Sequence, residues 1–174
     1  MAYSYNVGAS NMVGEGHNDF QMYDKEGAAD YPDYRKLSAD LLFKWNGFSL
    51  LAEYVNATAN GLNGLYVEKD EGAKLKPRQI ANYLALGNGL NVQAGYLFRK
   101  LWALDVAYSK VNPEWKETGQ SVLREADNIT FGASKYFNNN TFKLQLAGSY
   151  TSYNQLVGAG SKEFQVKLNL HILF

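Results

Sequence analysis

The last eleven residues, FQVKLNLHILF (164–174), decide the fold class of this chain. Apolar side chains fall on every second position, and polar ones such as Lys167 and His171 lie between them. A period of two is typical of a β-strand, because successive side chains of a strand point to opposite faces of the sheet. The apolar face of this strand consists of Phe164, Val166, Leu168, Leu170, Ile172 and Phe174.

The same alternation occurs throughout the chain, and helical periodicity is nearly absent. Tyrosine, of which there are 13, and other residues that favour strands are frequent, while the 16 glycines supply turns. We therefore predict an all-β protein with about eight strands. Their expected ranges are 2–10, 35–45, 48–56, 90–99, 102–109, 128–137, 141–151 and 164–174.

The connections between these strands alternate in length. Asn46-Gly47 is a strong signal for a type I′ hairpin, and residues 99–101 and the Asn139-Asn140 region form two further short turns. The other connections are longer and contain all three prolines, at positions where a missing backbone donor costs nothing. This arrangement predicts an antiparallel up-and-down sheet with short turns on one side and long loops on the other. The long loops span about 11–33, 57–89, 110–127 and 154–162.

Length and charge restrict the classes of protein to which the chain can belong. Its 174 residues suit a single domain, residues 1–174. With 17 basic and 17 acidic residues it has no net charge, which argues against a nucleic-acid partner. The absence of cysteine excludes disulfides and thiolate metal sites. No run of about 20 apolar residues could form a membrane-spanning helix, but a membrane-spanning strand needs only about 10 alternating residues.

Aromatic residues gather where the apolar faces meet the short turns, which is typical of the interface between a membrane and water. Lys135 is the one charge on an apolar face, and its long side chain can reach the interface near a turn. A soluble sheet with these faces would expose large apolar patches. We therefore predict a transmembrane β-barrel. The expected interface aromatics are Trp45, Phe48, Phe98, Trp102, Phe137 and Phe142.

The polar faces carry charges of both signs, which suits a salt-bridged barrel interior. The Asn46-Gly47 turn places Asp40 directly opposite Glu53, and two carboxylates opposed in this way repel each other. We therefore expect at least one basic residue of this face to contact Asp40 or Glu53. The charged residues that we expect to face the lumen are Lys36, Asp40, Lys44, Glu53, Arg99, Asp105, Lys143 and Lys167.

Closure of the barrel follows from the even strand number. We expect residues 2–10 to pair with residues 164–174, with both termini on the side of the short turns. Eight strands leave an interior that side chains can fill, so such a barrel would conduct poorly. If the chain is instead half of a larger barrel, completed by a second copy or by further strands, it could line a pore.

The C-terminal strand matches the assembly signal of bacterial outer-membrane barrels, a terminal aromatic with apolar residues at alternate positions: Val166, Leu168, Leu170, Ile172 and Phe174. GLNVQAGY (89–96), WALDVAYS (102–109) and ITFGASKYFN (129–138) resemble the phosphate-selective porin O/P family. The resemblance implies a porin-like protein of the bacterial outer membrane, delivered by the barrel assembly machinery through its C-terminal strand. Members of that family are sixteen-stranded and about twice this length, so the chain resembles their C-terminal half. None of their anion-binding residues is transferred to this chain.

Sites for other chemistry are weaker. His17 has Glu15 and Asp19 nearby, but a solvated loop explains the three residues better than a metal site does. His171 faces the polar side, where a hydrogen-bonded interior histidine is the simpler interpretation. The glycine pairs of the loops lack the strand and helix context of a nucleotide site. We therefore expect no catalytic residue, no metal and no cofactor.

The leading functional hypothesis is an outer-membrane porin-type barrel for passive diffusion of small or anionic solutes, or the C-terminal half of one. The alternative is a small structural barrel of eight strands with a side-chain-filled lumen that does not conduct ions. A barrel enzyme acting on lipid is the third hypothesis. The expected partners are a lipid bilayer and the assembly machinery, and a homo-oligomer is a further arrangement to test.

Overall fold

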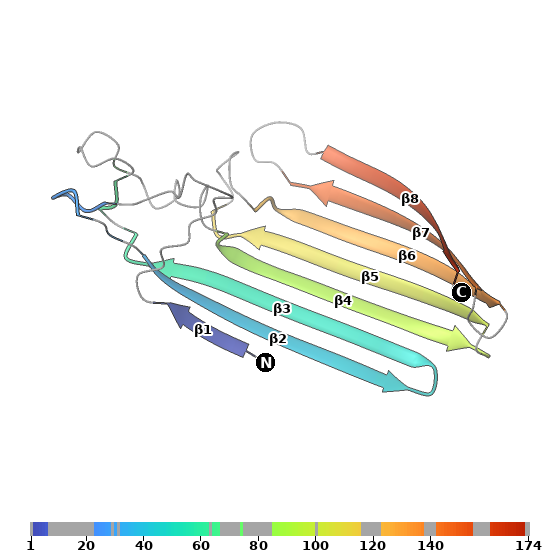
Figure 1. The fold of residues 1–174 in the computed structure, drawn as a ribbon. Helices are drawn as coiled ribbons and strands as arrows, with labels where there is room; N and C mark the ends of the chain where they lie inside the picture. The colour runs from blue at the N-terminus through green and yellow to red at the C-terminus, as the bar shows by residue number, and fades with distance from the viewer. Residues whose placement is uncertain are drawn as a thin grey trace.

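The structure is a computed structural model that describes residues 2–6, 23–28, 30, 32–62, 64–66, 74, 85–99, 101–115, 123–137, 142–154 and 161–172. Within these ranges no helix has the length and apolar character needed to cross a membrane. The regular elements form a single antiparallel sheet (Figure 1). Its strands are β1 (Ala2–Asn6), β2 (Asp33–Trp45), β3 (Phe48–Asn60), β4 (Gly87–Phe98), β5 (Trp102–Pro113), β6 (Ala126–Phe137), β7 (Phe142–Tyr153) and β8 (Ser161–Ile172).

The strand order is the sequence order, so the predicted all-β, up-and-down antiparallel architecture is confirmed. β2 to β8 each extend two to four residues further toward the long loops than their apolar alternation predicted. The extensions contain cross-strand pairs of polar residues, such as Asn88 opposite Asn112. Backbone hydrogen bonds continue the ladder there without help from apolar side chains, which is why the hydropathy pattern missed them.

The short turns have the registers that the sequence predicted. Asn46 (φ 43°) and Gly47 (φ 85°) both adopt the left-handed conformation that a type I′ turn requires. This turn places Trp45 opposite Phe48, and further along the hairpin Asp40 stands opposite Glu53, as expected. The turn between β6 and β7 likewise sets Phe137 opposite Phe142.

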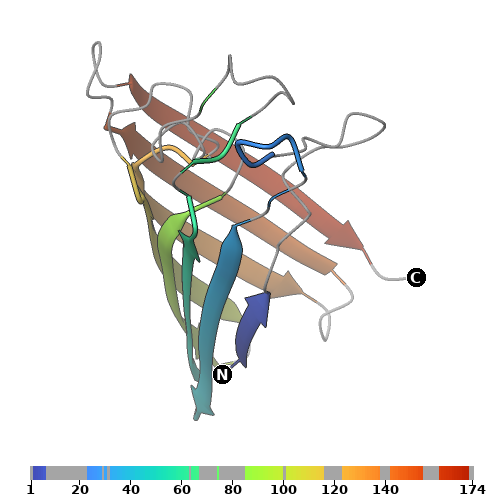
Figure 2. The same ribbon diagram turned by 90° about the vertical axis from the view of Figure 1, so that its left-hand side faces the viewer.

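Closure by β1 and β8 was predicted, and this prediction is wrong for the described residues. β1 pairs with β2 and β8 pairs with β7, so these two strands are the edges of an open trough (Figure 2). β1 covers only the part of β2 from Tyr34 to Ser38. Residues 39–45 have no neighbour on that side among the described residues, so β1 offers β8 no edge of matching length. Ala2 accordingly lies halfway along β2, whereas the end of β8 lies beside the short turns.

The short turns are displaced by two residues from one hairpin to the next. Phe48, at the first turn, pairs with Tyr96, which precedes the turn residue Phe98 by two positions. Trp102, at the second turn, pairs with Lys135, again two positions before the end of its strand. Two residues rise about 6.6 Å and two strand spacings cover about 9.6 Å. The strands are therefore tilted by about 35° from the normal of the plane that contains the turns.

The buried apolar cluster of the described residues lies at the long-loop end of the sheet. Leu65 and Leu86 are fully buried, and Ala59 and Leu62 complete the cluster. Tyr34 and Trp115 pack against it. Nearby, Tyr23 and Tyr66 exchange two backbone hydrogen bonds of 2.9 Å. This core thus joins the long-loop ends of β2 and β3 to the loops, and it is separate from the exposed apolar residues nearer the short turns.

Replacement of Gly47 by alanine tests the first turn. A Cβ at this position would lie 2.8 Å from the carbonyl oxygen of Leu97, and the φ of 85° disfavours any side chain. We expect Gly47→Ala to lower the free energy of unfolding by about 1–3 kcal/mol in urea titrations in detergent micelles. Gly148→Ala is the control, because its added Cβ meets nothing within 4 Å and should change stability by less than about 0.5 kcal/mol. Equal effects of the two substitutions would contradict this account.

Candidate functional site

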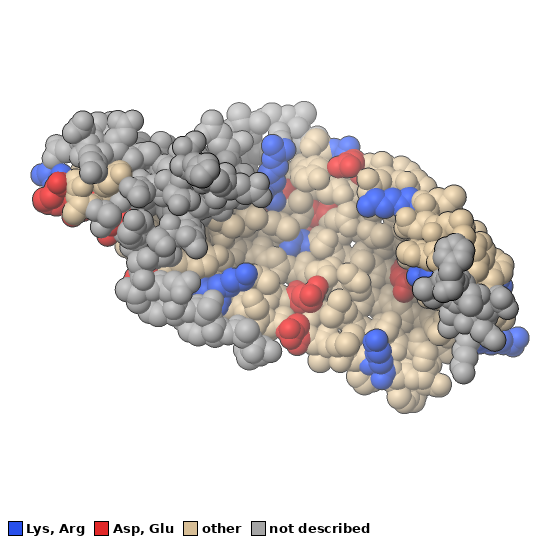
Figure 3. All heavy atoms as spheres, viewed as in Figure 1, with Lys and Arg blue, Asp and Glu red and all other residues tan. Residues whose placement is uncertain are grey.

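The hollow of the trough is the polar side of the sheet. Figures 1 and 3 look into this hollow, and Figure 3 shows acidic and basic side chains standing on it. Because side chains alternate along each strand, the apolar residues between these charges face the convex side. They are far from buried: Phe164 is 72% exposed and Leu168 is 68% exposed. A face of this kind needs an apolar medium or a partner to cover it.

The turn-side aromatics lie where the sequence placed them, at the short-turn ends of the strands. The rings of Phe137 and Phe142 are 5.0 Å apart, and those of Tyr96 and Phe98 are 4.6 Å apart. The Nζ of Lys135 lies 4.2 Å from the ring centroid of Trp102. The one charge on the apolar face therefore lies among these rings.

A second aromatic row lies at the other border of the convex face, and sequence reasoning missed it. On β2 to β7, four or five alternate positions separate the short turn from the polar residue that ends the apolar stripe, and Lys135 on β6 is the one charge within these stripes. Counting alternate positions from each turn would have revealed this regularity. The last residue of the apolar stripe is aromatic on four strands: Tyr54, Tyr108, Tyr150 and Phe164.

Polar residues end the apolar face directly beyond this row. The hydroxyl of Tyr108 donates a hydrogen bond of 2.6 Å to the carboxylate of Asp127, and Lys110 forms an ion pair of 3.5 Å with the same carboxylate. Further toward the loops, the side-chain amide of Asn112 donates to the Asn88 side chain at 3.0 Å. Beyond β5, partial burial raises the pKa of the Glu114 carboxyl, although much of that residue is exposed.

The apolar face is therefore a level band. On β4 it runs from Leu90 to Phe98, about 26 Å along the strand. A tilt of about 35° reduces this length to a height of about 22 Å. The polar border shifts with the turns by two residues from the first hairpin to the second, whereas from β5 to β8 it stays on one cross-strand row, that of Tyr108, Ile129, Tyr150 and Phe164. The band therefore keeps roughly this height from β2 to β7 and is tallest at the β8 edge. The lipid-exposed band of outer-membrane barrels is about 25 Å tall and is flanked by aromatic girdles.

The concave side contains a groove of about 620 Å³ with a mixed lining, in which polar residues such as Gln93, Thr130 and Gln145 alternate with apolar ones such as Leu51 and Ala107. One complete row of cross-strand neighbours on this side is polar from β2 to β8. The side-chain amide of Asn128 donates 2.6 Å to Thr151 within it. The row consists of Asp40, Glu53, Asn91, Ser109, Asn128, Thr151 and Glu163.

Glu53 has an amide as its neighbour, whereas a basic residue was expected. The side-chain nitrogen of Asn91 donates a hydrogen bond of 2.7 Å to the Glu53 carboxylate. Asn91 is the cross-strand partner of Glu53 on β4, just as Asp40 is on β2. The Nζ of Lys143 lies 5.3 Å from the ring centroid of its own cross-strand neighbour, Tyr136. A contact between a basic residue and Asp40 stays a prediction.

The charges of the concave side are unevenly distributed along the trough. Lys44 and Lys143 are each one residue from a short-turn pair, and Arg99 stands in the turn between β4 and β5 with φ 47°. Asp105 on β5 is three residues from its turn. Its cross-strand neighbours are Gly95 on β4 and Gly132 on β6. The remaining charged residues expected in the lumen lie further toward the loops or on the edge strand: Lys36, Asp40, Glu53 and Lys167.

Of the candidate metal ligands and His171, the described part of the chain contains only His171. The described residues contain no group of three or more His, Asp or Glu side chains that could hold a metal ion. His17, Glu15 and Asp19 lie outside the described residues, as does Phe174 at the end of the assembly signal. His171 pairs across the strands with Lys143, which is neither a serine nor a carboxylate that could work with the imidazole.

Replacement of Asn91 by aspartate tests the polar row. It would add a third carboxylate to the adjacent pair Asp40 and Glu53 and remove the donor to Glu53. We expect Asn91→Asp to lower the free energy of unfolding by about 1–3 kcal/mol at pH 7, and to recover below about pH 4 as carboxylates are protonated. Gln93→Glu is the control, because its neighbours are Leu51 and Ala107. A pH-independent loss would rule out charge repulsion as the cause.

Comparisons of the chain with protein-family models, with curated proteins and with solved structures give no match.

Proposed function

We propose that the sheet is part of the wall of an outer-membrane β-barrel of porin type. In this proposal the convex face lies in lipid and the concave face lines a water-filled lumen. The observation that carries the proposal is the level apolar band, bounded by an aromatic row on each side and tilted by about 35°. Strands of outer-membrane barrels tilt by about 35–45°. In a water-soluble sheet, no physical force would confine the exposed apolar residues to a band between two aromatic borders.

The open edges favour a wall segment over a barrel closed by eight strands. All twelve residues of β8 are exposed, and its outer backbone groups have no strand partner among the described residues. In lipid, every backbone donor and acceptor needs a partner, so further strands must cover this edge. These strands come from a second copy or from additional chain, as in the larger barrels that the sequence resembles.

The distribution of charge supports passage of small or anionic solutes. Lys44, Arg99 and Lys143 stand at the short-turn end of the concave side, where the nearest carboxylate of the expected set is Asp105. Basic groups at the mouth of a narrow channel raise the local concentration of anions. The proposed location is the bacterial outer membrane, with the C-terminal strand as the segment that the assembly machinery binds.

Two neighbouring substitutions test whether the convex face lies in lipid. Val106 is on the convex face near the middle of the band, and Ala107 is on the concave face beside it. We expect Val106→Lys to lower the free energy of unfolding in lipid vesicles by about 2–4 kcal/mol, because the charge would lie near the midplane. Ala107→Lys should cost less than about 0.5 kcal/mol, because its ammonium reaches water.

The measurement is the folded fraction on heat-modified gels after urea titration in vesicles of phosphatidylcholine. In a soluble protein the two variants would be about equally stable, because Val106 is already 39% exposed and lysine is tolerated on a surface in water. Equal folded fractions of the two variants would therefore disprove the membrane wall. Protection of the strands from added protease in the same vesicles provides a second, independent check.

Reversal potentials in planar bilayers test the proposed lumen. We expect the reconstituted chain to form channels that prefer chloride to potassium, and Lys143→Glu to lower this preference by about fivefold through the change in local charge. Lys162→Glu is the control, since Lys162 has a convex position on β8, beyond the long-loop border of the apolar band. A chain that inserts but never conducts would support the structural, non-conducting alternative.

A further inference from the structure

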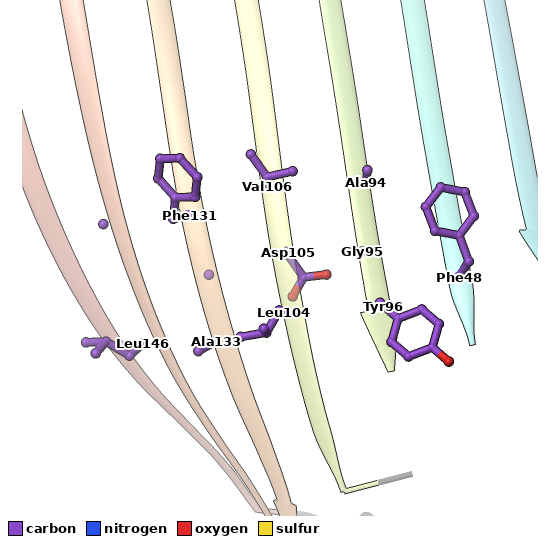
Figure 4. Close-up of a pocket in the computed structure, with 12 residues that line it drawn as sticks. Phe48, Ala94, Gly95, Tyr96, Leu104, Asp105, Val106, Phe131, Ala133 and Leu146 are labelled. Atoms are coloured by element: carbon purple, nitrogen blue, oxygen red, sulfur yellow. The ribbon is translucent and has the colours of Figure 1, made fainter. Parts of the chain in front are cut away.

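The convex face has a hollow of about 550 Å³ in the turn-side half of the apolar band (Figure 4). Its walls are large apolar side chains, including Phe48, Tyr96, Leu104, Phe131 and Leu146. The hollow therefore lies between strands that are otherwise studded with bulky residues. It faces the side of the sheet that the proposed function assigns to lipid.

Small residues at fixed cross-strand positions create the hollow. Ala94 contributes a single methyl group between Phe48 and Val106, as Figure 4 shows. Ala133 stands between Leu104 and Leu146, its partners on β5 and β7. The floor consists of backbone at the glycines and of Asp105, which lies between Gly95 and Gly132 (Figure 4). The depression is thus a property of the strand registers, because a two-residue shift of β4, β6 or β7 would replace Ala94, Ala133 or Gly148 by a larger side chain of the same face.

A cation stands at the turn-side end of this hollow. Lys135 follows Ala133 by two positions on β6, about 6.6 Å along the strand and on the same face. Its Nζ lies over the rings of Trp102 (4.2 Å) and Phe137 (5.8 Å). Of the charged residues that the structure describes, Lys135 alone has a convex position within the apolar band. Its ammonium is held among interface aromatics, where a headgroup phosphate would lie.

We propose that the hollow and Lys135 together bind one phospholipid, with an acyl chain in the hollow and the headgroup phosphate against the Lys135 ammonium. The charge complementarity favours this occupant: the lining is apolar except for Asp105 at the floor, and the charge at the turn-side end is a cation with three donors that suit phosphate oxygens. This proposal rests on the proposed membrane location.

The experiment uses the full chain folded into vesicles of a galactolipid that contains no phosphate. Trace amounts of spin-labelled phosphatidylglycerol, or of spin-labelled diacylglycerol with the same chains, report the immobilised lipid fraction by electron spin resonance. We expect the phosphate-bearing lipid to associate about fivefold more strongly, and Lys135→Gln to abolish that preference. Lys135→Arg should retain it. Ala133→Phe, which fills the hollow, should reduce the association of both lipids.

Two substitutions serve as matched controls. Lys162→Gln removes a convex charge beyond the band, and Ala52→Phe enlarges a small convex residue that does not line the hollow. Neither should alter lipid association, and heat-modified gels verify that every variant is folded. If Lys162→Gln acts like Lys135→Gln, or if the wild type shows no preference, the lipid site is refuted.

The outcomes also separate this proposal from the one on which it rests. A chain that fails to insert into vesicles overturns both. A chain that inserts, yet binds both labelled lipids equally, overturns the lipid site alone and leaves the barrel wall intact. Chemical cross-linking in the same vesicles reports the oligomeric state. If Ala133→Phe changes the oligomeric state and leaves lipid association unchanged, the hollow is a contact between copies and the lipid proposal is wrong.

Discussion

The register between neighbouring strands is the constraint on which the rest of this structure depends. The period of two along each strand separates polar from apolar side chains, but only the pairing registers decide whether the faces of eight strands agree. A slip of one residue at the Asn46-Gly47 turn would move Lys44 to the convex face and Phe43 into the trough. The two-residue shift between successive turns then determines the tilt of the strands, and with it the height of the apolar band.

This architecture reverses the usual positions of apolar and polar groups. The buried cluster around Leu65 and Leu86 is small and serves the loop end, while the large apolar side chains of the sheet are exposed. In water such a face would drive association, whereas in lipid its exposure is favourable. The hydrogen-bonded residues of the concave side, such as Asn91 with Glu53, face the interior of the trough, where water can reach them. One arrangement of strands thus accounts for both surfaces.

The two edges give the sheet its dependence on other strands. β8 has its full length available for pairing, and β1 covers only part of β2. An exposed edge of this length is a template for a further strand. The convex hollow adds a second feature that depends on registers, because Ala94, Ala133 and Gly148 come from three different strands. Function, in this view, belongs to the surfaces that the assembled sheet presents, and no single motif carries it.

The sequence by itself determined the strands, the short hairpins and the turn-side aromatics. These follow from local chemistry: alternation along one strand, and the positive φ values that Asn46 and Gly47 tolerate. The tertiary structure alone decided the registers between strands that are joined by long loops. The pairing of Asn91 with Glu53 depends on a register between β3 and β4 that no short turn defines. The open edge between β1 and β8, the level row of Tyr54, Tyr108 and Tyr150, and the hollow beside Lys135 have the same origin, since a long connection leaves the register to be chosen by the packing and pairing of the whole sheet.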